Sequence, residues 1–217
     1  MQMQPHSTPA KIFLARHCES EFNAQNRVAG QLDPALSPKG RQQAHDLARV
    51  LGDEPLSAIY ASSLTRTVQT AGPTAAARGL QVFAREALKE MHMGILQGRF
   101  RDERDPEAQR ISQERKQHKE HYRIPGGETL LELTRRVLPC LNDIVESEAG
   151  NTILIVGHRR TNAIVLAALM GWLPEAAARL DLRQKYLYEI APGVEPRLAT
   201  IRLDGPKLGA RYEGFRE

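Results

Sequence analysis

Two short apolar runs, one near the start of the chain and one in its second half, lead directly to a histidine. They are KIFLARH at residues 11–17 and TILIVGH at residues 152–158. Runs of this kind are typical of buried strands in a parallel sheet. Polar residues at the carboxyl ends of such strands face the crevice in which α/β proteins bind ligands. The pattern therefore predicts that His17 and His158 meet at one edge of a sheet.

Short apolar runs alternate with stretches of helical period along the chain, an order typical of α/β domains. We predict a single domain over residues 1–217, a three-layer α/β/α sandwich around a mainly parallel central sheet. The stretch SPKGRQQAHDLARVLG predicts a helix with Ser37 as its N-cap and Gly52 as its terminator. Thr129 and Glu132 have the spacing of a capping box at the start of a later helix.

Residues 98–127 differ from the rest, because they are mixed in charge and poor in large apolar side chains. We expect a small capping insertion there that runs over the surface and is helical in part. His118 and His121 lie at helical spacing within it, but no third ligand is near in sequence, so a solvated face is favoured over a metal site.

The net charge of +4 is spread along the whole chain, with acidic residues among the basic ones. Such a diffuse excess does not predict nucleic-acid binding and suits a small anionic substrate better. The apolar stretches are too short to span a membrane. Two distant cysteines, and a first stretch MQMQPHSTPAK without an apolar core or cleavage site, favour a reduced, cytoplasmic setting.

Two arginines accompany the histidines. Arg16 precedes His17, and Arg66 falls in the first turns of the helix that follows the apolar run SAIYAS. Each of these residues alone is more often structural than functional. Together they would place two imidazoles and two guanidiniums around one hollow, and a purely structural role does not explain why both histidines directly follow apolar strands.

Five segments in the same order along the chain extend this pattern. They are RHCESEFN, GQLDPALSPKGRQQA, IYASSLTRTVQTA, LKEMHMGILQG and LIVGH. On these segments the chain resembles the histidine phosphatase superfamily, the group of phosphoglycerate mutases and small phosphatases. The resemblance implies that His17 is the nucleophile and forms a phosphohistidine, with Glu90 as the proton donor.

The resemblance further implies that Arg16 and Arg66 clamp the phosphoryl group, with His158 and Asn23 as additional hydrogen-bond donors. The chemistry of these residue types agrees. Guanidiniums match phosphoryl oxygens, and they disfavour protonation of a neighbouring imidazole, which must be neutral to attack. A dianionic phosphate beside Glu90 would favour the protonated carboxyl, the form that donates to a leaving alkoxide.

Two positions depart from the family pattern. Cys18 stands where the family usually has glycine, and Arg159 and Arg160 stand where many members have small residues. A thiol at the border of a basic site should have a lowered pKa, so a reactive Cys18 is one hypothesis and a buried, inert cysteine is the other. Arg159 is a further candidate phosphate ligand if its side chain enters the pocket, where it would select more anionic substrates.

The leading interpretation is a phosphatase that hydrolyses a small phosphomonoester through a phosphohistidine. One alternative is a cofactor-dependent phosphoglycerate mutase, because LKEMHMGILQG resembles the mutase form of that segment. The other is a catalytically impaired member that binds phosphate or protein. The phosphatase mechanism requires no cofactor and no metal, and we expect no nucleic-acid or membrane partner, although a homodimer is compatible with the fold.

Overall fold

The computed structural model describes residues 8–117 and 122–217. Within this part of the chain, seven strands form one sheet in the order β3-β2-β4-β1-β5-β6-β7. The strands are β1 (Lys11–Arg16), β2 (Leu56–Ser62), β3 (Val82–Arg85), β4 (Thr152–Gly157), β5 (Tyr186–Ala191), β6 (Arg197–Arg202) and β7 (Arg211–Glu213).

The sheet has a parallel half and an antiparallel half. Strands β3, β2, β4 and β1 are parallel, whereas β5, β6 and β7 are added to β1 in antiparallel pairs. The parallel half, as predicted, contains both strands that end in histidine. In the β1–β4 register Arg16 lies opposite Gly157, and the His17 amide donates to the Gly157 carbonyl at 2.9 Å.

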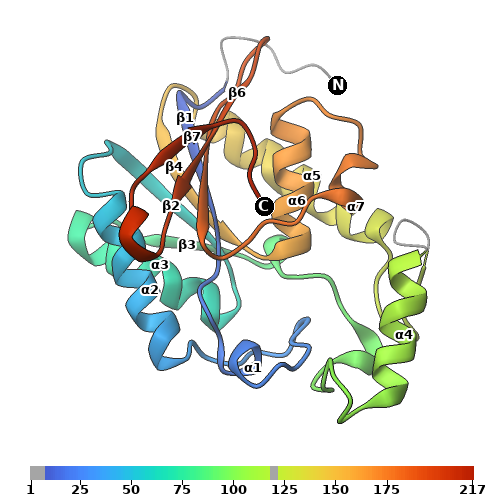
Figure 1. Ribbon diagram of the computed structural model, residues 1–217. Coiled ribbons are helices and arrows are strands. Elements are labelled where there is room, and N and C mark those ends of the chain that lie inside the picture. Colours follow the sequence, from blue (N-terminus) through green and yellow to red (C-terminus); the bar gives the residue numbers. More distant parts are fainter. Residues whose placement is uncertain (1–7, 118–121) are drawn as a thin grey trace.

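Helices cover both faces of the sheet, so the predicted three-layer sandwich is confirmed (Figure 1). One layer holds α2 (Pro38–Val50) and α3 (Thr65–Arg78), and the other holds α5 (Leu130–Ser147), α6 (Arg159–Leu169) and the short α7 (Ala176–Arg179). Helices α1 (Glu21–Ala24) and α4 (Pro106–Gln117) lie outside these layers, at the end of the sheet to which β1 leads. Three 3-10 turns cover Glu86–Leu88, Gly94–Leu96 and Gly205–Lys207.

The alternation of side chains along each strand separates two cores. In β1, Ile12 and Leu14 belong to the cluster that packs under α5 and α6, whereas Phe13 and Ala15 belong to the cluster under α2 and α3. All four side chains are fully buried. Because successive side chains point to opposite faces of a strand, a continuous apolar run is what a strand covered by helices on both faces requires.

The predicted helix starts are confirmed. The Ser37 hydroxyl accepts from the Gly40 amide at 3.0 Å, and Thr129 and Glu132 form the reciprocal bonds of a capping box. The predicted terminator of α2 is slightly wrong, because Leu51 is the C-cap and Gly52 follows it.

The segment over residues 98–127 contains α4, which packs against a small separate cluster. Its members are Val28, Leu96, Ala108, Ile111 and Ile124. His118 and His121 lie outside the described residues. Among the helices that are described, none is both long and apolar enough to cross a membrane.

The interior strand β4, which lies between β2 and β1, should contribute strongly to stability. Leu154 is fully buried there, so Leu154→Ala is expected to lower the free energy of unfolding by about 2–5 kcal/mol through lost burial and a residual cavity. Leu131→Ala is the matched control: its side chain is 56% exposed, and the change should stay within about 0.5 kcal/mol. Denaturant unfolding measures both, and equal losses would contradict this account of the core.

Candidate active site

His17 is held as a neutral imidazole with one free nitrogen. Its Nδ1 lies 2.7 Å from the carbonyl oxygen of Cys18, so this nitrogen carries the hydrogen and donates. Burial lowers the pKa of His17 well below its ordinary value, and the guanidiniums of Arg66 and Arg16 lower it further. The ring therefore keeps a lone pair on Nε2, the nitrogen that a nucleophile of this kind needs.

Arg16 and Arg66 reach the same hollow and are anchored by backbone carbonyls. The Arg16 Nη1 donates to Leu182 at 3.1 Å, and the two Nη atoms of Arg66 donate to Leu32 and Gly30 at 2.8 and 2.7 Å. Among the described residues no carboxylate lies within 4.0 Å of either guanidinium, and both Nε atoms are buried without a partner. Burial lowers the pKa of each arginine to about 10. Such groups are arranged to receive an anion.

His158 packs against His17, with ring centroids 5.2 Å apart. Its Nε2 lies 2.9 Å from the Ser62 hydroxyl, which also accepts from the Leu64 amide. Ser62 can therefore donate its hydrogen to Nε2, which leaves the hydrogen of the imidazole on Nδ1. That Nδ1 is buried and has no partner within the described structure. His158 does not itself line the cavity, but its ring borders His17 and presents a spare donor.

Asn23 belongs to the first helix turn after β1. Its side-chain oxygen accepts from the Ser20 amide, from the Ser20 hydroxyl and from Gln184, each at 3.1 Å. The oxygen is thus fully used, and the amide NH2 remains as the group that can donate to an anion in the cavity, which Asn23 lines.

Glu90 supplies a carboxylate to the same hollow. Its two oxygens lie 3.3 Å from the backbone amide of Arg160, and Oε1 also accepts from the Met91 amide at 2.9 Å. Among the described residues that line the cavity, Glu90 is the only acid.

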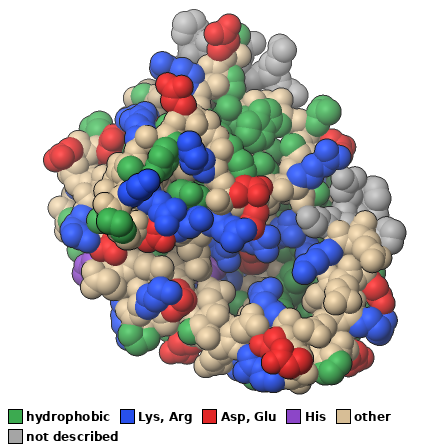
Figure 2. Space-filling view, in the orientation of Figure 1, with side chains coloured by type: hydrophobic (Ala, Val, Ile, Leu, Met, Phe, Trp, Pro, Cys, Tyr) green, Lys and Arg blue, Asp and Glu red, His purple; other side chains and the backbone are tan. Residues whose placement is uncertain are grey.

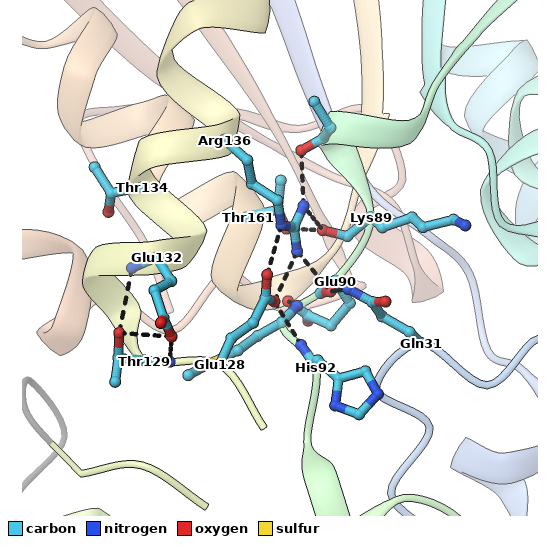
Figure 3. Close-up of polar contacts among 12 residues, drawn as sticks. Gln31, Lys89, Glu90, His92, Glu128, Thr129, Glu132, Thr134, Arg136 and Thr161 are labelled. Atoms are coloured by element: carbon cyan, nitrogen blue, oxygen red, sulfur yellow. Dashed lines mark hydrogen bonds and ion pairs between the residues drawn. The ribbon is translucent and has the colours of Figure 1, made fainter. Parts of the chain in front are cut away.

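The backbone that carries Glu90 is fixed by one arginine of α5 (Figure 3). Arg136 donates to the carbonyls of Ala87, Lys89 and Glu90 at 2.8–2.9 Å and forms a two-pronged ion pair with Glu128. Burial would raise the pKa of Glu128, but Arg136 and the hydrogen bond from the His92 amide lower it below its usual value. The carboxylate of Glu90 is therefore mounted on a tethered turn.

Two further side chains bind the same turn. Thr161 donates to the Lys89 carbonyl at 2.9 Å, and Gln31 donates to the Glu90 carbonyl at 3.1 Å (Figure 3). His92, which follows Glu90 closely, contacts the Gly94 amide through its ring and does not line the cavity.

Cys18 does not border the basic hollow, and the hypothesis of a reactive thiol is wrong for this structure. Its side chain is 5% exposed and packs with Leu36 and Ala44. Burial raises the pKa of the Cys18 thiol to about 12, and a hydrogen bond with Thr70 opposes this only in part. The side chain replaces a glycine by filling an apolar space next to α2.

These side chains surround a cavity of about 260 Å³. The predicted residues Arg16, His17, Asn23, Arg66, Glu90 and Arg159 all line it. Six of the lining residues are arginines: Arg16, Arg66, Arg101, Arg115, Arg159 and Arg160. Figure 2 shows Lys and Arg side chains gathered around a hollow near the centre of this face.

Comparison with known proteins agrees with this geometry. The model of the Histidine phosphatase superfamily (branch 1) matches residues 12–195. A relative from Yersinia enterocolitica, named "Probable phosphoglycerate mutase GpmB", is 35% identical over 208 residues, which cover 91% of this chain and 97% of the relative. The chain belongs to the histidine phosphatase superfamily.

Solved structures match over most of the chain. A mycobacterial glucosyl-3-phosphoglycerate phosphatase in complex with VO3 has a TM-score of 0.77 and 27% identity, and the match covers 87% of this chain and 96% of that one. Bacillus stearothermophilus YhfR has a TM-score of 0.72 and 27% identity, with coverage of 83% and 90%. With phosphatases among its structural neighbours, the chain is an enzyme of the histidine phosphatase type.

Sequence reasoning missed several residues of the site. The sequence offered one weak indication for Ser62: it is a polar residue at the end of an apolar run, as His17 and His158 are. Arg115 and Arg101 lie in the segment 98–127, where many charged residues alternate and composition does not distinguish a buried arginine from a solvated one. Arg136 sits in an amphipathic helix next to another arginine, and only its partners reveal its role.

The buried histidines predict a pH dependence of stability. His17 and His158 both have pKa values well below 6.5 in the folded protein, so below pH 6.5 the unfolded chain binds protons that the folded protein does not. Stability should fall as pH falls, by as much as about 1.4 kcal/mol per histidine between pH 7.5 and 5.5. Denaturant unfolding across this range measures the effect.

The contribution of one histidine can be isolated. His158→Gln should reduce the pH-dependent loss by about 1.4 kcal/mol, whereas His45→Gln, at an exposed position of α2, should leave it unchanged. A His158→Gln profile parallel to that of the unmodified protein would show that His158 is not held neutral.

Proposed function

We propose that this protein is a phosphatase that hydrolyses a small phosphomonoester through a phosphohistidine on His17. One observation carries the proposal: a neutral imidazole with Nδ1 bound to a carbonyl lies beside two guanidiniums that have no carboxylate partner in the described structure. Attack on a phosphate dianion needs a neutral nucleophile and nearby positive charges that no carboxylate neutralises.

In the first half-reaction Nε2 of His17 attacks phosphorus while the bond between phosphorus and the ester oxygen breaks. Arg16 and Arg66 stabilise the charge on the transferring phosphoryl oxygens, because their fork-shaped donors match that geometry. Asn23 and the free Nδ1 of His158 add neutral donors. The leaving alkoxide takes a proton from the carboxyl group of Glu90.

In the second half-reaction a water molecule attacks the phosphorus of the phosphohistidine. Glu90, now a carboxylate, accepts a proton from that water, and the bond between Nε2 and phosphorus breaks. Inorganic phosphate is released, and the electron pair of the broken bond returns to Nε2, which restores the neutral imidazole. The carboxylate thus donates in one step and accepts in the other.

A phosphoglycerate mutase is the second candidate, favoured by the names of sequence relatives such as the Yersinia protein. Both activities share the phosphohistidine and differ in whether water or another substrate molecule receives the phosphoryl group. The solved phosphatases, including one in complex with VO3, support hydrolysis. The presence of all the predicted catalytic groups disfavours a member that only binds.

The decisive assay measures products. With small phosphomonoesters, release of inorganic phosphate is expected, and His17→Ala should reduce the rate by on the order of 10³-fold or more, the effect of losing a covalent nucleophile. His45→Ala, at an exposed position, is the matched control and should not change it.

Two results would refute the phosphatase. One is 2-phosphoglycerate formed from 3-phosphoglycerate and a trace of the bisphosphate in place of free phosphate. The other is the absence of both turnover and label on His17 from a phosphorylated substrate.

Arg136 provides a separate prediction about positioning. Lysine cannot reproduce the fork that holds three carbonyls and Glu128, so Arg136→Lys should let Glu90 shift and lower kcat by on the order of 10²-fold for alkyl phosphates. An aryl phosphate whose leaving group needs no proton should lose much less. An equal loss for both substrates would mean that Arg136 acts only on the general stability of the site.

A further inference from the structure

We propose that Arg115 of α4 and Arg160 of α6 bind a second anionic group of the substrate, which makes the substrate a phosphomonoester that also carries a carboxylate or another phosphate. The inference rests on the proposed phosphatase function and specifies its substrate class. It depends on four observations about charge and burial in the cavity.

Arg115 is a buried cation without a counterion in the described structure. Its residue is only 8% exposed, and its one described hydrogen bond runs from Nη2 to the Met91 sulfur at 3.2 Å. Its Nε has no partner at all within the described residues. A sulfur atom is a weak acceptor, so most of the donors of this guanidinium are unused. Burial of a charge in this state is unfavourable unless an anion occupies the cavity for part of the time.

Arg160, at the start of α6, is in a similar state. Its side chain is half-buried, and Nη1 has only a long contact of 3.4 Å with the Ala178 carbonyl. Burial, together with the nearby positive charges of Arg115 and Arg159, lowers the pKa of Arg160 to about 10. Arg115 and Arg160 line the same cavity, as one anion-binding site requires.

Two neighbouring arginines, in contrast, have carboxylate partners. Arg110, on the exposed side of α4, pairs with Glu114 at 2.5 Å, and Arg159 lies 2.6 Å from Asp181. Arg159 therefore lines the cavity with its charge already partly neutralised. Arg115 and Arg160 have no such carboxylate within 4.0 Å in the described structure.

The charge balance of the cavity assigns the second group to the substrate. A phosphate dianion is matched by Arg16 and Arg66 at His17, and Glu90 must exchange a proton. Of the other four arginines, Arg159 pairs with Asp181 and Arg101 is exposed, so Arg115 and Arg160 remain as buried or half-buried charges in a cavity of about 260 Å³. Because the space is small, an anion that reaches them while phosphate occupies the first site is best supplied by the same molecule.

The test uses substrates that differ in one group. 3-Phosphoglycerate and glycerol 3-phosphate differ only by a carboxylate in place of a hydroxymethyl group, and glycerol 1,3-bisphosphate adds a phosphate. We expect kcat/KM for phosphate release to be at least about 10-fold higher for one or both anionic substrates, a modest value for a charge-assisted contact. The kcat/KM values of 3-phosphoglycerate and of glycerol 1,3-bisphosphate, each divided by that of glycerol 3-phosphate, show whether the second group is a carboxylate or a phosphate.

Variants then locate the site. Arg160→Gln and, independently, Arg115→Met should each reduce the ratio of the anionic to the neutral substrate at least about 5-fold. Arg110→Met, on the exposed face of the same helix, is the matched control and should preserve the ratio. Thermal unfolding identifies any variant that fails to fold. The substrate ratios measured on the unmodified protein test the inference even if a variant does not fold.

Phosphate release without preference for either anionic substrate would overturn this inference and leave the phosphatase intact. An anionic preference that persists in both variants would also overturn it, because other residues would then carry the selectivity. Failure of every substrate, with no label on His17, would instead refute the phosphatase function itself.

Discussion

The site depends on the parallel pairing of β1 with β4. That register sets Arg16 opposite Gly157, so the chain leaves both strands at the same level and the two histidine rings meet. A shift by one residue would turn the side chains of one strand to the other face of the sheet and separate the pair. Both strands are buried between helix layers, and the alternating cores fix the register much more firmly than the histidines could.

Residue order along the sequence was enough to predict this part of the molecule. Apolar runs that end in Arg16–His17 and in His158 define the strands, and turn and cap residues such as Ser37 and Thr129 define where helices begin. Contacts between distant segments were not predictable in this way. The guanidinium of Arg136 joins α5 to the turn that carries Glu90. Nothing in the sequence of either segment predicts this contact.

Cys18 and Arg115 show that the burial of a side chain was equally hard to predict from the sequence. The position of Cys18 next to His17 suggests a reactive thiol, yet the side chain of Cys18 packs in an apolar cluster and burial raises its pKa. An arginine in a polar helix suggests a solvated group, yet Arg115 is buried. Neighbours in sequence do not decide which way a side chain faces at a loop or on a helix. Packing against distant residues decides it.

The division between the fixed turn and the capping segment has an evolutionary consequence. Glu90 is tethered to α5 and α6 by Arg136 and Thr161, whereas α4 packs on a small cluster of its own. Substitutions in α4 can therefore accumulate without displacing Glu90 or His17. In a lineage that keeps the tethered turn, changes confined to α4, which contributes Arg115 to the cavity, can alter which molecule the cavity accepts.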